Sequence, residues 1–350
     1  MIVTRAHTKK VLAGTLALGG SDYISIQTMW KKPLTAVTPE LLTGIEHLRQ
    51  LGCELLRFAV PDIGTSEIFG ALCSRTSMPL VADIHFDYRI ALRVLDFPVA
   101  KLRINPGNIG APWKVEEVVR KAKDKNVPIR IGVNHGSLPK NLSGEKNHSL
   151  AMVWAAEMEM EILHSLDFQN AVFSLKSSDL RTTVNANLLF AEKYDYPLHV
   201  GVTEAGPLIP GIVKNTLALN SLLSIGIGNT IRISLSDSEE HEIITCREVL
   251  GALGLRGGGI TIVSCPKCGR TGFDTGEFLR EISEDLYRLP GPLKVAIMGC
   301  AVNGPGEAKD ADAGITGAGD KVILFKRGEI VKTTDRKNAR EEFLSLLKEL

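Results

Sequence analysis

The feature that most constrains the fold of this chain is an alternation of short and long segments between about residues 24 and 254. Short runs of β-branched or apolar residues alternate there with longer amphipathic stretches of helical periodicity. The expected strands cover residues 24–28, 54–60, 79–83, 99–104, 128–133, 171–176, 197–202 and 230–235. Eight strands that are each followed by a helix are typical of a (β/α)8 TIM-type barrel, which we predict. A doubly wound open sheet of the same α/β class is the alternative.

A glycine-rich segment at residues 254–259, "GLRGGG", ends this alternation and is typical of a short linker. The rest of the chain predicts a strand, a helix, a second strand, a glycine-rich loop, a hairpin and a last helix. That order predicts a small α+β domain, which carries three of the six cysteines. We therefore expect two domains, a barrel over residues 1–254 and a cysteine-bearing domain over residues 260–350.

The charge balance of the chain limits its partners. Its 41 Lys and Arg residues nearly match 40 Asp and Glu residues, a formal net charge of +1, which argues against nucleic acid or a membrane surface as a partner. The N-terminal segment lacks the apolar stretch of a signal peptide, and residues 11–20 are too short and glycine-rich to span a bilayer. Six cysteines without an export signal indicate a reducing compartment, so we expect a cytoplasmic protein.

Four of the expected strands carry an arginine between apolar neighbours. Arg57, Arg103, Arg130 and Arg232 stand in the segments "LLRFA", "KLRIN", "PIRIG" and "TIRIS", and Lys176 ends a further strand. Because side chains alternate along a strand, an arginine whose neighbours face the helices faces the barrel lumen. The C-terminal ends of the strands form the mouth of a barrel, where its chemistry gathers. We therefore expect these cations to converge on one mouth, where they would repel one another without a partner.

Two explanations of such a cation cluster are open. Each cation could form a structural pair with a carboxylate such as Asp62, Asp83 or Glu204, but acids near the strand ends are too few for that. A ligand with several negative charges is the better explanation, most simply a diphosphate, because guanidinium groups bind phosphate oxygens bidentately. Glu204 would then be a proton donor or the partner of one arginine. His85 would be a general acid or base, or an ordinary loop residue.

Three cysteines lie in the last third of the chain, Cys265 and Cys268 in "CPKCG" and Cys300 in "GCAVNGPGE". Zinc ribbons use such a pair, but a structural zinc ion needs four ligands, and all eight histidines lie at or before His241. Three thiolates can instead hold three irons of a [4Fe–4S] cluster and leave the fourth iron to a weaker ligand or a substrate. We favour the iron–sulfur cluster, and zinc is the alternative that these residues leave open.

Seven segments together resemble the bacterial 4-hydroxy-3-methylbut-2-enyl diphosphate synthases of the non-mevalonate pathway of isoprenoid biosynthesis. They follow one another in the family's order along nearly the whole chain, and they are "VADIHFDYRIAL", "LRINPGNIG", "IRIGVNHGSL", "GVTEAG", "GIGNTIRISL", "CPKCGR" and "GCAVNGPGEA". The resemblance implies a (β/α)8 barrel followed by a [4Fe–4S] domain similar to those of sulfite and nitrite reductases. It also implies that Glu307, in the "NGPGE" motif, is the fourth ligand of the cluster, beside Cys265, Cys268 and Cys300.

The resemblance further implies an activity. Members of the family open the ring of 2-C-methyl-D-erythritol 2,4-cyclodiphosphate, remove water and consume two electrons, which a reduced flavodoxin or ferredoxin supplies singly. Glu204 would supply a proton as the hydroxyl group leaves as water. Because a carboxylate is a weaker partner for iron than a thiolate, the iron that Glu307 binds could exchange ligands during catalysis. The residues implied to hold the diphosphate or line the site are Arg57, Asp83, His85, Arg103, Arg130, Asn134, Lys176, Arg232, Ser234 and Asn303.

Two loops depart from the family's usual sequence. Residues 28–34 read "TMWKKPL" and residues 207–211 read "PLIPG", so contacts made by these loops cannot be carried over from the family. Two other classes of protein remain as alternatives. One is a zinc-ribbon barrel enzyme that acts on a sugar phosphate without redox chemistry. The other is a non-catalytic iron–sulfur sensor or carrier, which would leave the cation cluster and Glu204 unexplained.

The length of the linker leads to a prediction about assembly. The expected last barrel helix, near residues 238–253, is about 24 Å long, and the chain leaves it at the end of the barrel opposite the mouth. The linker spans at most about 20 Å, so it could barely bring the second domain back to the mouth of its own barrel. We therefore predict a head-to-tail homodimer in which the second domain of one chain covers the barrel mouth of the other.

Overall fold

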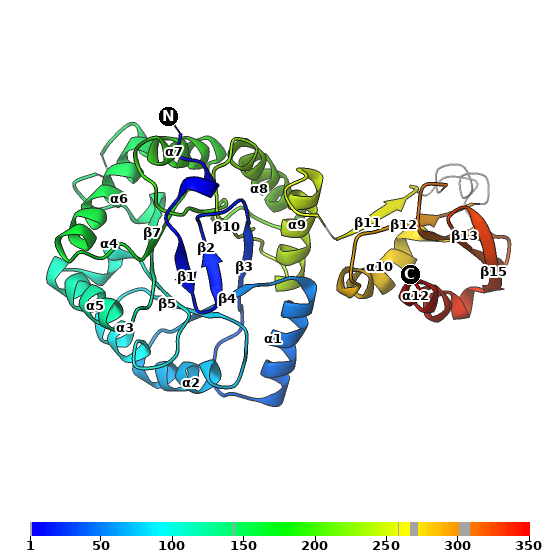
Figure 1. The fold of residues 1–350 in the computed structure, drawn as a ribbon, viewed down its shortest axis with the longest axis horizontal. Coiled ribbons are helices and arrows are strands. Elements are labelled where there is room, and N and C mark those ends of the chain that lie inside the picture. Colours follow the sequence, from blue (N-terminus) through cyan, green and yellow to red (C-terminus); the bar gives the residue numbers. More distant parts are fainter. Residues whose placement is uncertain (1, 143, 258, 267–271, 301–308) are drawn as a thin grey trace. The chain divides into compact units, whose positions relative to one another are not determined.

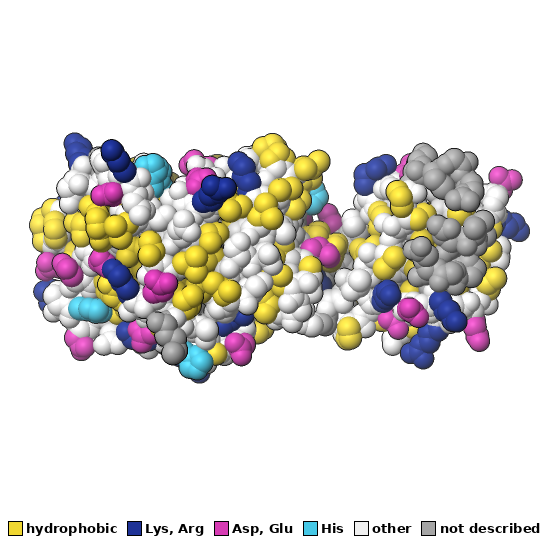
Figure 2. Space-filling model, turned by 90° about the horizontal axis from the view of Figure 1, so that it is seen from above, with side chains coloured by type: hydrophobic (Ala, Val, Ile, Leu, Met, Phe, Trp, Pro, Cys, Tyr) yellow, Lys and Arg dark blue, Asp and Glu magenta, His cyan; other side chains and the backbone are white. Residues whose placement is uncertain are grey.

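The structure is a computed structural model that describes residues 2–142, 144–257, 259–266, 272–300 and 309–350. The chain folds as two compact units, Met1–Leu255 and Arg256–Leu350 (Figure 1). Basic and acidic side chains are interspersed on the visible face of each unit (Figure 2), in keeping with the net charge of +1. Among the described helices, none is long and apolar enough to cross a membrane.

The first unit is a barrel of parallel strands, as predicted. Neighbouring strands follow the order β8–β7–β6–β5–β4–β3–β10–β9, and every pairing in this order is parallel. The circle closes where Phe173 of β8 bridges Leu198, just before β9, and the Phe173 amide donates to the Pro197 carbonyl at 2.9 Å. This closure excludes an open doubly wound sheet. The strands are β3 (Ser25–Met29), β4 (Leu55–Ala59), β5 (Leu80–Ile84), β6 (Lys101–Ile104), β7 (Ile129–Asn134), β8 (Ala171–Lys176), β9 (His199–Val200) and β10 (Thr230–Ile231).

Helices surround the barrel and return the chain from the end of one strand to the start of the next (Figure 1). Several begin at a side chain that accepts a hydrogen bond from a backbone amide of the first turn, as Thr38, Asp62, Asp179 and Ser238 do. These caps lie in the loops that follow the strands, so they help to set where each loop ends. The helices are α1 (Pro39–Leu51), α2 (Ile63–Cys73), α3 (Tyr88–Val94), α4 (Pro106–Ile109), α5 (Pro112–Asp124), α6 (His148–Ser165), α7 (Leu180–Lys193), α8 (Leu208–Leu223) and α9 (Glu239–Ala252).

Two strands are shorter than the sequence predicts. β9 and β10 have 2 residues each, whereas the predicted strands cover residues 197–202 and 230–235. The two strands pair through His199 with Thr230 and Val200 with Ile231. Gly201 follows with a φ of 149°, and a Cβ atom on it would lie 2.1 Å from the Arg232 carbonyl oxygen. The two backbones therefore approach too closely for a side chain, and regular pairing ends before the mouth.

An N-terminal hairpin, which the sequence analysis did not predict, closes the end of the barrel opposite the mouth. β1 (Val11–Ala13) pairs antiparallel with β2 (Leu16–Leu18). A Cβ atom on Gly14, at the turn, would lie 3.3 Å from the Ala100 side chain, just before β6. Apolar side chains of the hairpin pack against residues near the start of three barrel strands, and this cluster consists of Val11, Ala13, Leu18, Leu55, Val81 and Val172. The open end of the barrel is therefore the mouth at the C-terminal ends of the strands.

The second unit is an α+β fold built on one sheet with the strand order β11–β12–β13–β14–β15. β11 (Ile260–Ser264), β12 (Leu293–Met298) and β13 (Ala313–Ala318) run parallel, while β14 (Lys321–Lys326) and β15 (Glu329–Asp335) complete an antiparallel hairpin. Amphipathic helices α10 (Thr275–Arg288) and α12 (Ala339–Lys348) bury apolar side chains against this sheet, among them Phe278, Ile282, Leu286 and Phe343.

β13 corrects the prediction of a glycine-rich loop between the second strand and the hairpin. Gly314 lies directly opposite Phe325 in the register of β13 and β14, and a Cβ atom on Gly314 would lie 2.1 Å from the Phe325 ring. A Cβ atom on Gly317 would lie 2.4 Å from the side chain of Phe273. The glycines are therefore part of a strand here, because they leave room for the side chains of Phe325 and Phe273.

We predict that Gly314→Val destabilises the second unit by about 1–3 kcal/mol, because the new side chain would displace the Phe325 ring from a packed core. Thermal unfolding of the full chain measures this. Gly276→Ala, in the first turn of α10, is the matched control, since its nearest neighbour would be at an ordinary contact distance of 3.5 Å. Equal unfolding temperatures for the two variants would contradict the packing role of Gly314.

Candidate active site at the barrel mouth

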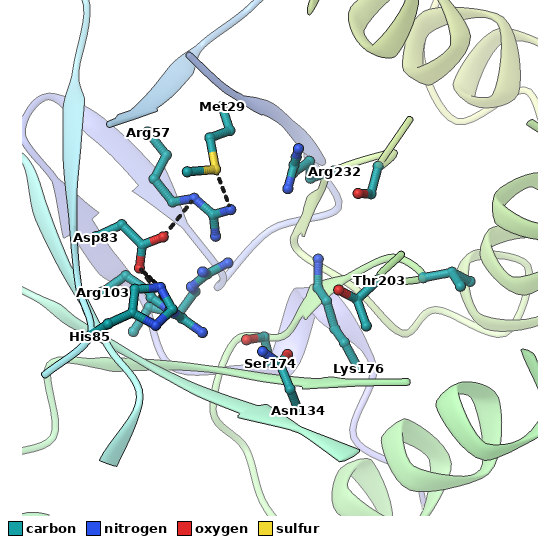
Figure 3. A pocket seen from close by; sticks show the side chains of 13 residues that line it. Met29, Arg57, Asp83, His85, Arg103, Asn134, Ser174, Lys176, Thr203 and Arg232 are labelled. Carbon is teal, nitrogen blue, oxygen red and sulfur yellow. Dashed lines mark hydrogen bonds and ion pairs between the residues drawn. The ribbon is translucent and has the colours of Figure 1, made fainter. Parts of the chain in front are cut away.

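A cavity of about 250 Å³ opens at the C-terminal ends of the barrel strands (Figure 3). Its volume lies just below the range of about 300–1,000 Å³ that is usual for drug-sized ligands, so it suits a compact ligand. The side chains that line it come from strand ends and the loops that follow, and they are Met29, Arg57, Asp83, His85, Arg103, Arg130, Asn134, Ser174, Lys176, Val202, Thr203, Arg232 and Ser234. Most of them are polar or charged, which indicates a polar ligand.

The structure brings together the strand-end residues that the sequence analysis singled out. In Figure 3, Asp83, Arg57 and His85 lie on one side of the cavity, and Lys176 and Arg232 lie across from them. The alternation of side chains along the strands explains this convergence, since it turns each arginine into the lumen. The predicted residues that line the cavity are Arg57, Asp83, His85, Arg103, Arg130, Asn134, Lys176, Arg232 and Ser234, and Asn303 lies outside the described residues.

Glu204 does not line the cavity in the structure. It is exposed in the loop after β9, whereas the preceding residues Val202 and Thr203 do line the cavity. Its backbone has a φ of 50°, a conformation that is uncommon for a residue with a side chain and that recurs at functional sites. The role of Glu204 as a proton donor stays a prediction.

Asp83 is the anionic centre of one side of the cavity. Its Oδ1 lies 2.7 Å from Nη1 of Arg103, and its Oδ2 lies 3.5 Å from Nε of Arg57. Nε2 of His85 lies 2.7 Å from the same Nη1 of Arg103. Burial raises the pKa of Asp83, but Arg57 and Arg103 outweigh burial and hold this pKa well below its usual value. Asp83 is therefore ionised, and one carboxylate orients two arginines.

Arg232, on the other side, pairs with an acid that the sequence analysis missed. The carboxylate of Glu242, on α9, is fully buried and lies 3.1 Å from Nη2 and 3.2 Å from Nε of Arg232. The sequence predicts counter-ions near the strand ends, whereas Glu242 lies inside a helix. Its place one turn before the buried Cys246 was the available signal. Structural pairing therefore explains part of the cation cluster.

Arg130 and Lys176 have no counter-ion within ion-pair distance in the described part of the chain, and Nε of Arg130 is buried without an acceptor. Burial lowers the pKa of Lys176 well below its usual value, and the nearby charges of Arg130 and Arg232 lower it further. Burial and the other arginines lower the pKa of Arg130 in the same way. The carboxylate of Asp83 offsets only part of the burial of Arg130, and neither cation has an ion pair in the described site, so these two would gain most from an anion.

A second buried polar layer lies beneath the cavity, and the sequence analysis did not assign it. Nζ of Lys101 donates to Oε1 of Gln27 at 3.2 Å, and Nδ1 of His199 lies 3.4 Å from the Thr230 hydroxyl. Nε2 of His199 has no hydrogen-bond partner among the described residues. Burial and the charge of Lys176 hold the pKa of His199 well below its usual value, so this imidazole is neutral and adds no charge beneath the cations.

Four further residues line the cavity without having been predicted, and they are Met29, Ser174, Val202 and Thr203. Sδ of Met29 accepts a hydrogen bond from Nη2 of Arg57 at 2.8 Å. Ser174 stands two residues before Lys176 in β8, so the alternation that turned Lys176 inward could also have identified Ser174. No comparable signal marked Thr203, because it lies beyond the end of regular pairing.

Two of the four predicted cluster ligands are among the described residues. Cys265 directly follows β11 and Cys300 lies two residues after β12, so two parallel neighbouring strands place both thiols at one edge of the sheet. The amide of Gly299 donates to Sγ of Cys265 at 3.0 Å. Cys268 and Glu307 lie outside the described residues, and within the described ranges no group of three metal-ligating side chains is found. Burial raises the pKa of the other described thiols to about 12, and these are Cys53, Cys73 and Cys246.

Comparisons with known proteins assign both units to one family. Residues 8–247 match the GcpE TIM-barrel domain, and residues 261–349 match the GcpE protein C-terminal domain. The chain belongs to the GcpE family. The family membership predicted from the seven sequence segments is therefore confirmed.

Relatives within the GcpE family are similar over nearly the whole chain. One from Treponema pallidum (strain Nichols) is 53% identical over 330 residues, which cover 91% of this chain and 82% of that protein. One from Treponema denticola is 51% identical over 350 residues (93% and 90%), and one from Thermodesulfovibrio yellowstonii is 45% identical over 334 residues (95% of each). All three are named 4-hydroxy-3-methylbut-2-en-1-yl diphosphate synthase (flavodoxin).

We predict that Lys176→Met stabilises the ligand-free protein by about 1–4 kcal/mol, as replacement of buried ions by apolar groups does, and weakens the binding of anions. The sign of the pH dependence follows from the lowered pKa of Lys176. The folded state binds fewer protons than the unfolded state, so the wild type gains stability as the pH rises toward about 10.4, and the variant should lack this gain.

Chemical denaturation across the pH range measures this difference. Lys193→Met removes a lysine that pairs with Glu157 at 3.1 Å on the surface, and it serves as the control. If Lys176→Met destabilised the protein at every pH, Lys176 would have a structural role.

Proposed function

We propose that this chain catalyses the reaction for which its GcpE relatives are named. It opens the ring of 2-C-methyl-D-erythritol 2,4-cyclodiphosphate, releases water and takes up two electrons, and the product is 4-hydroxy-3-methylbut-2-enyl diphosphate. The observation that carries this proposal is the cation cluster at the barrel mouth, where five cationic side chains outnumber the two carboxylates that pair with them. A zinc-dependent enzyme that acts on a sugar phosphate has no support among the relatives.

The diphosphate would bind between the two sides of the cavity. Arg130 and Lys176, which lack counter-ions in the described site, would contact it together with Arg232. Negative charge grows on the diphosphate when the ring opens and its bond to carbon breaks. Cations that are already in place and poorly solvated stabilise such charge more than water does. Asn134 and Ser234, which line the same cavity, would add neutral hydrogen bonds.

A hydroxyl group that leaves as water needs a proton, and we propose that Glu204 supplies it. Asp83 is unsuited to this role because Arg57 and Arg103 keep it ionised. Glu204 follows Thr203, which lines the cavity, and its side chain is not tied to any of these arginines by an ion pair in the described structure. Its exposed position leaves it free to approach a bound substrate.

The cysteines of the second unit fit a [4Fe–4S] cluster by their chemistry. Thiolates are the donors that iron–sulfur clusters prefer, and a backbone hydrogen bond to sulfur, such as that from Gly299 to Cys265, tunes the potential of such clusters. An apolar group of side chains packs beside Cys265 and would limit access of water. We propose Cys265, Cys268, Cys300 and Glu307 as the ligands. When bound, the cluster would deliver single electrons from a reduced flavodoxin, which the names of the relatives include, or from a ferredoxin.

Turnover under anaerobic conditions tests the proposed function. We expect protein with about four irons and four sulfides per chain, as a cubane cluster requires, that converts the cyclodiphosphate when a chemical reductant is present. Cys300→Ser should lose the cluster and the turnover. Arg130→Ala should keep the cluster spectrum and bind the cyclodiphosphate at least about tenfold more weakly, since a charge-assisted contact is lost. Stoichiometric zinc without sulfide in such a preparation would refute the proposal.

We also propose a head-to-tail homodimer in which the second unit of one chain serves the barrel of the other. The length of the connection supports this arrangement. α9 ends at Ala252 and β11 begins at Ile260, so the connecting residues span at most about 25 Å when fully extended. The helix they follow leads away from the mouth, because each barrel helix runs antiparallel to its strand. In a dimer with a two-fold axis, the second unit of each chain would reach the barrel mouth of the other chain in the same way.

A mixture of two inactive variants tests this assembly. We predict that Glu204→Gln and Cys300→Ser, each inactive alone, regain activity when their subunits exchange. A mixed dimer assembled in trans has one site with both lesions and one site with neither, so its activity should approach half that of the wild-type dimer. Mixed dimers that form, as native mass spectrometry can show, and yet stay inactive would mean that each chain builds its own site.

A further inference from the structure

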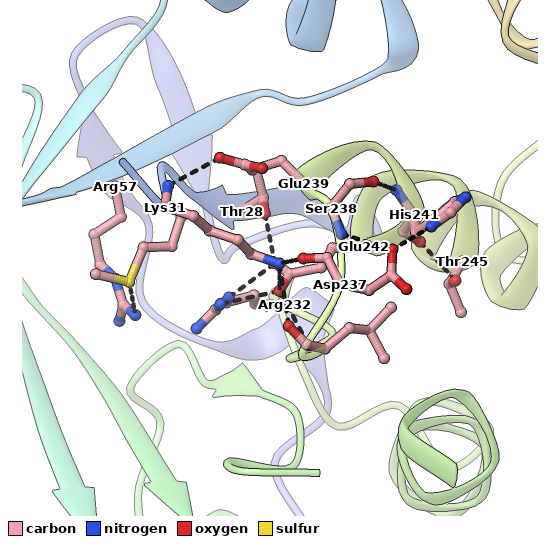
Figure 4. A network of polar contacts seen from close by, with 12 residues as sticks. Thr28, Lys31, Arg57, Arg232, Asp237, Ser238, Glu239, His241, Glu242 and Thr245 are labelled. Carbon is pink, nitrogen blue, oxygen red and sulfur yellow. Dashed lines mark hydrogen bonds and ion pairs between the residues drawn. The ribbon is translucent and has the colours of Figure 1, made fainter. Parts of the chain in front are cut away.

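Glu242 is a buried carboxylate that holds together two loops of the barrel mouth (Figure 4). Its Oε2 accepts a hydrogen bond from the hydroxyl of Thr28 at 2.6 Å, and its Oε1 accepts one from the amide of Leu235 at 3.0 Å. Both oxygens also accept from Arg232, and Nζ of Lys31 lies 3.1 Å from Oε1. Every one of these partners is a donor, so the site needs a group that accepts on all sides, which an ionised carboxylate does.

The pairing with Arg232 is side-on and leaves one edge of the guanidinium group free. Nε and one proton of Nη2 point to Glu242, and the remaining donors, those of Nη1 and the second proton of Nη2, are not used by this carboxylate. Arg232 lines the cavity beside Lys176 (Figure 3), and its side chain also reaches Glu242, which does not line the cavity (Figure 4). Glu242 therefore sets the plane in which Arg232 meets a ligand.

Lys31 shares the carboxylate of Glu242 with Arg232. The single negative charge of Glu242 is therefore divided between two cations, and the carboxylates of Asp237 and Glu239 also lie near Lys31. Lys31 is itself fixed by the carbonyl oxygens of Leu235, at 3.1 Å, and Asp237, and its own amide donates to Glu239 at 2.9 Å. Lys31 thus ties the loop after β3 to the loop after β10, on which Arg232 lies.

Burial raises the pKa of Glu242, but Arg232 and the hydrogen bonds from Thr28 and Leu235 outweigh it and keep this pKa below its usual value. The carboxylate is therefore charged in the ligand-free protein and is in place before a substrate arrives. Such preorganisation reduces the cost of ordering Arg232 during binding.

We propose that Glu242 is a positioning residue for the diphosphate: it presents the free edge of Arg232 to the ligand, and Lys31 holds the two loops in place around that carboxylate. This inference rests on the proposed function, because it assumes an anion between Arg232 and Lys176. It adds a residue of α9 and a residue of the loop after β3, neither of which lines the cavity.

A double-mutant cycle tests the coupling between Glu242 and Arg232. The variants are Glu242→Gln, Arg232→Met and the double variant, and the readouts are KM and kcat for the cyclodiphosphate and the Kd for inorganic diphosphate by calorimetry. Gln would turn an amide donor toward a set of donors, so Arg232 should lose its fixed plane. We expect Glu242→Gln to raise KM and Kd about tenfold or more with a smaller change in kcat, since it weakens ground-state binding. In the Arg232→Met background, Glu242→Gln should change Kd less than about twofold.

Lys31→Met gives a second test that spares the buried carboxylate, in case Glu242→Gln fails to fold. It should weaken diphosphate binding severalfold in the wild type and leave Kd unchanged in the Arg232→Met background. Glu157→Gln is the control, because Glu157 also joins two elements, through Lys193 at 3.1 Å and Tyr194 at 2.7 Å, and none of these residues lines the cavity. This control should bind and turn over as the wild type does.

The possible outcomes separate the two proposals. Wild-type protein that neither binds diphosphate nor converts the cyclodiphosphate would refute the proposed function. Wild-type activity with an unchanged Kd in Glu242→Gln and in Lys31→Met would refute the positioning role alone. Equal losses of affinity in the presence and absence of Arg232 would also refute it, because Glu242 would then act through the general stability of the barrel.

Discussion

The repulsion among buried cations at the barrel mouth is the constraint on which the rest of the structure depends. Five cationic side chains line one cavity, and the carboxylates of Asp83 and Glu242 form ion pairs with three of them. A cluster of this kind costs folding free energy when it is empty, because poorly solvated like charges lie close together. The remainder of the barrel, with its closed sheet and its hairpin beneath, supplies the apolar burial that offsets this cost.

The two carboxylates that orient arginines at the mouth, Asp83 and Glu242, lie on a strand and on a helix. Asp83 lies at the end of β5 and orients Arg57 and Arg103, which lie on the two neighbouring strands. Glu242 lies on a helix and does not line the cavity, but it binds Arg232, which does. Its carboxylate therefore orients Arg232 without placing a negative charge in the cavity lining. Arg130 and Lys176 are left for the ligand. This arrangement orients the cations without neutralising all of them, which suits an anion whose charge grows during the reaction.

The second unit follows the same rule of placing reactive groups where parallel strands end. Cys265 and Cys300 follow β11 and β12, which are parallel neighbours, so the two thiols come to one edge of the sheet although the chain separates them widely. Phe325 lies across Gly314 and belongs to the apolar group beside Cys265. A glycine that looks like a loop residue in the sequence is therefore part of the support for a proposed metal ligand.

The amino-acid sequence by itself determined the barrel, its open end and most of the cations at its mouth. These features follow from periodicity, since a strand has a repeat of two residues and turns every second side chain into the lumen. Resemblance added the family, which motifs carry without reference to packing. What periodicity could not reveal depends on pairs that meet across the fold. The partner of Arg232 is on a helix, and the close approach of Gly201 to Arg232 shortens β9. The aromatic ring that packs over Gly314 belongs to another strand. Contacts between distant segments are decided by tertiary packing, because a local stretch of sequence contains only one of the two residues that form each contact.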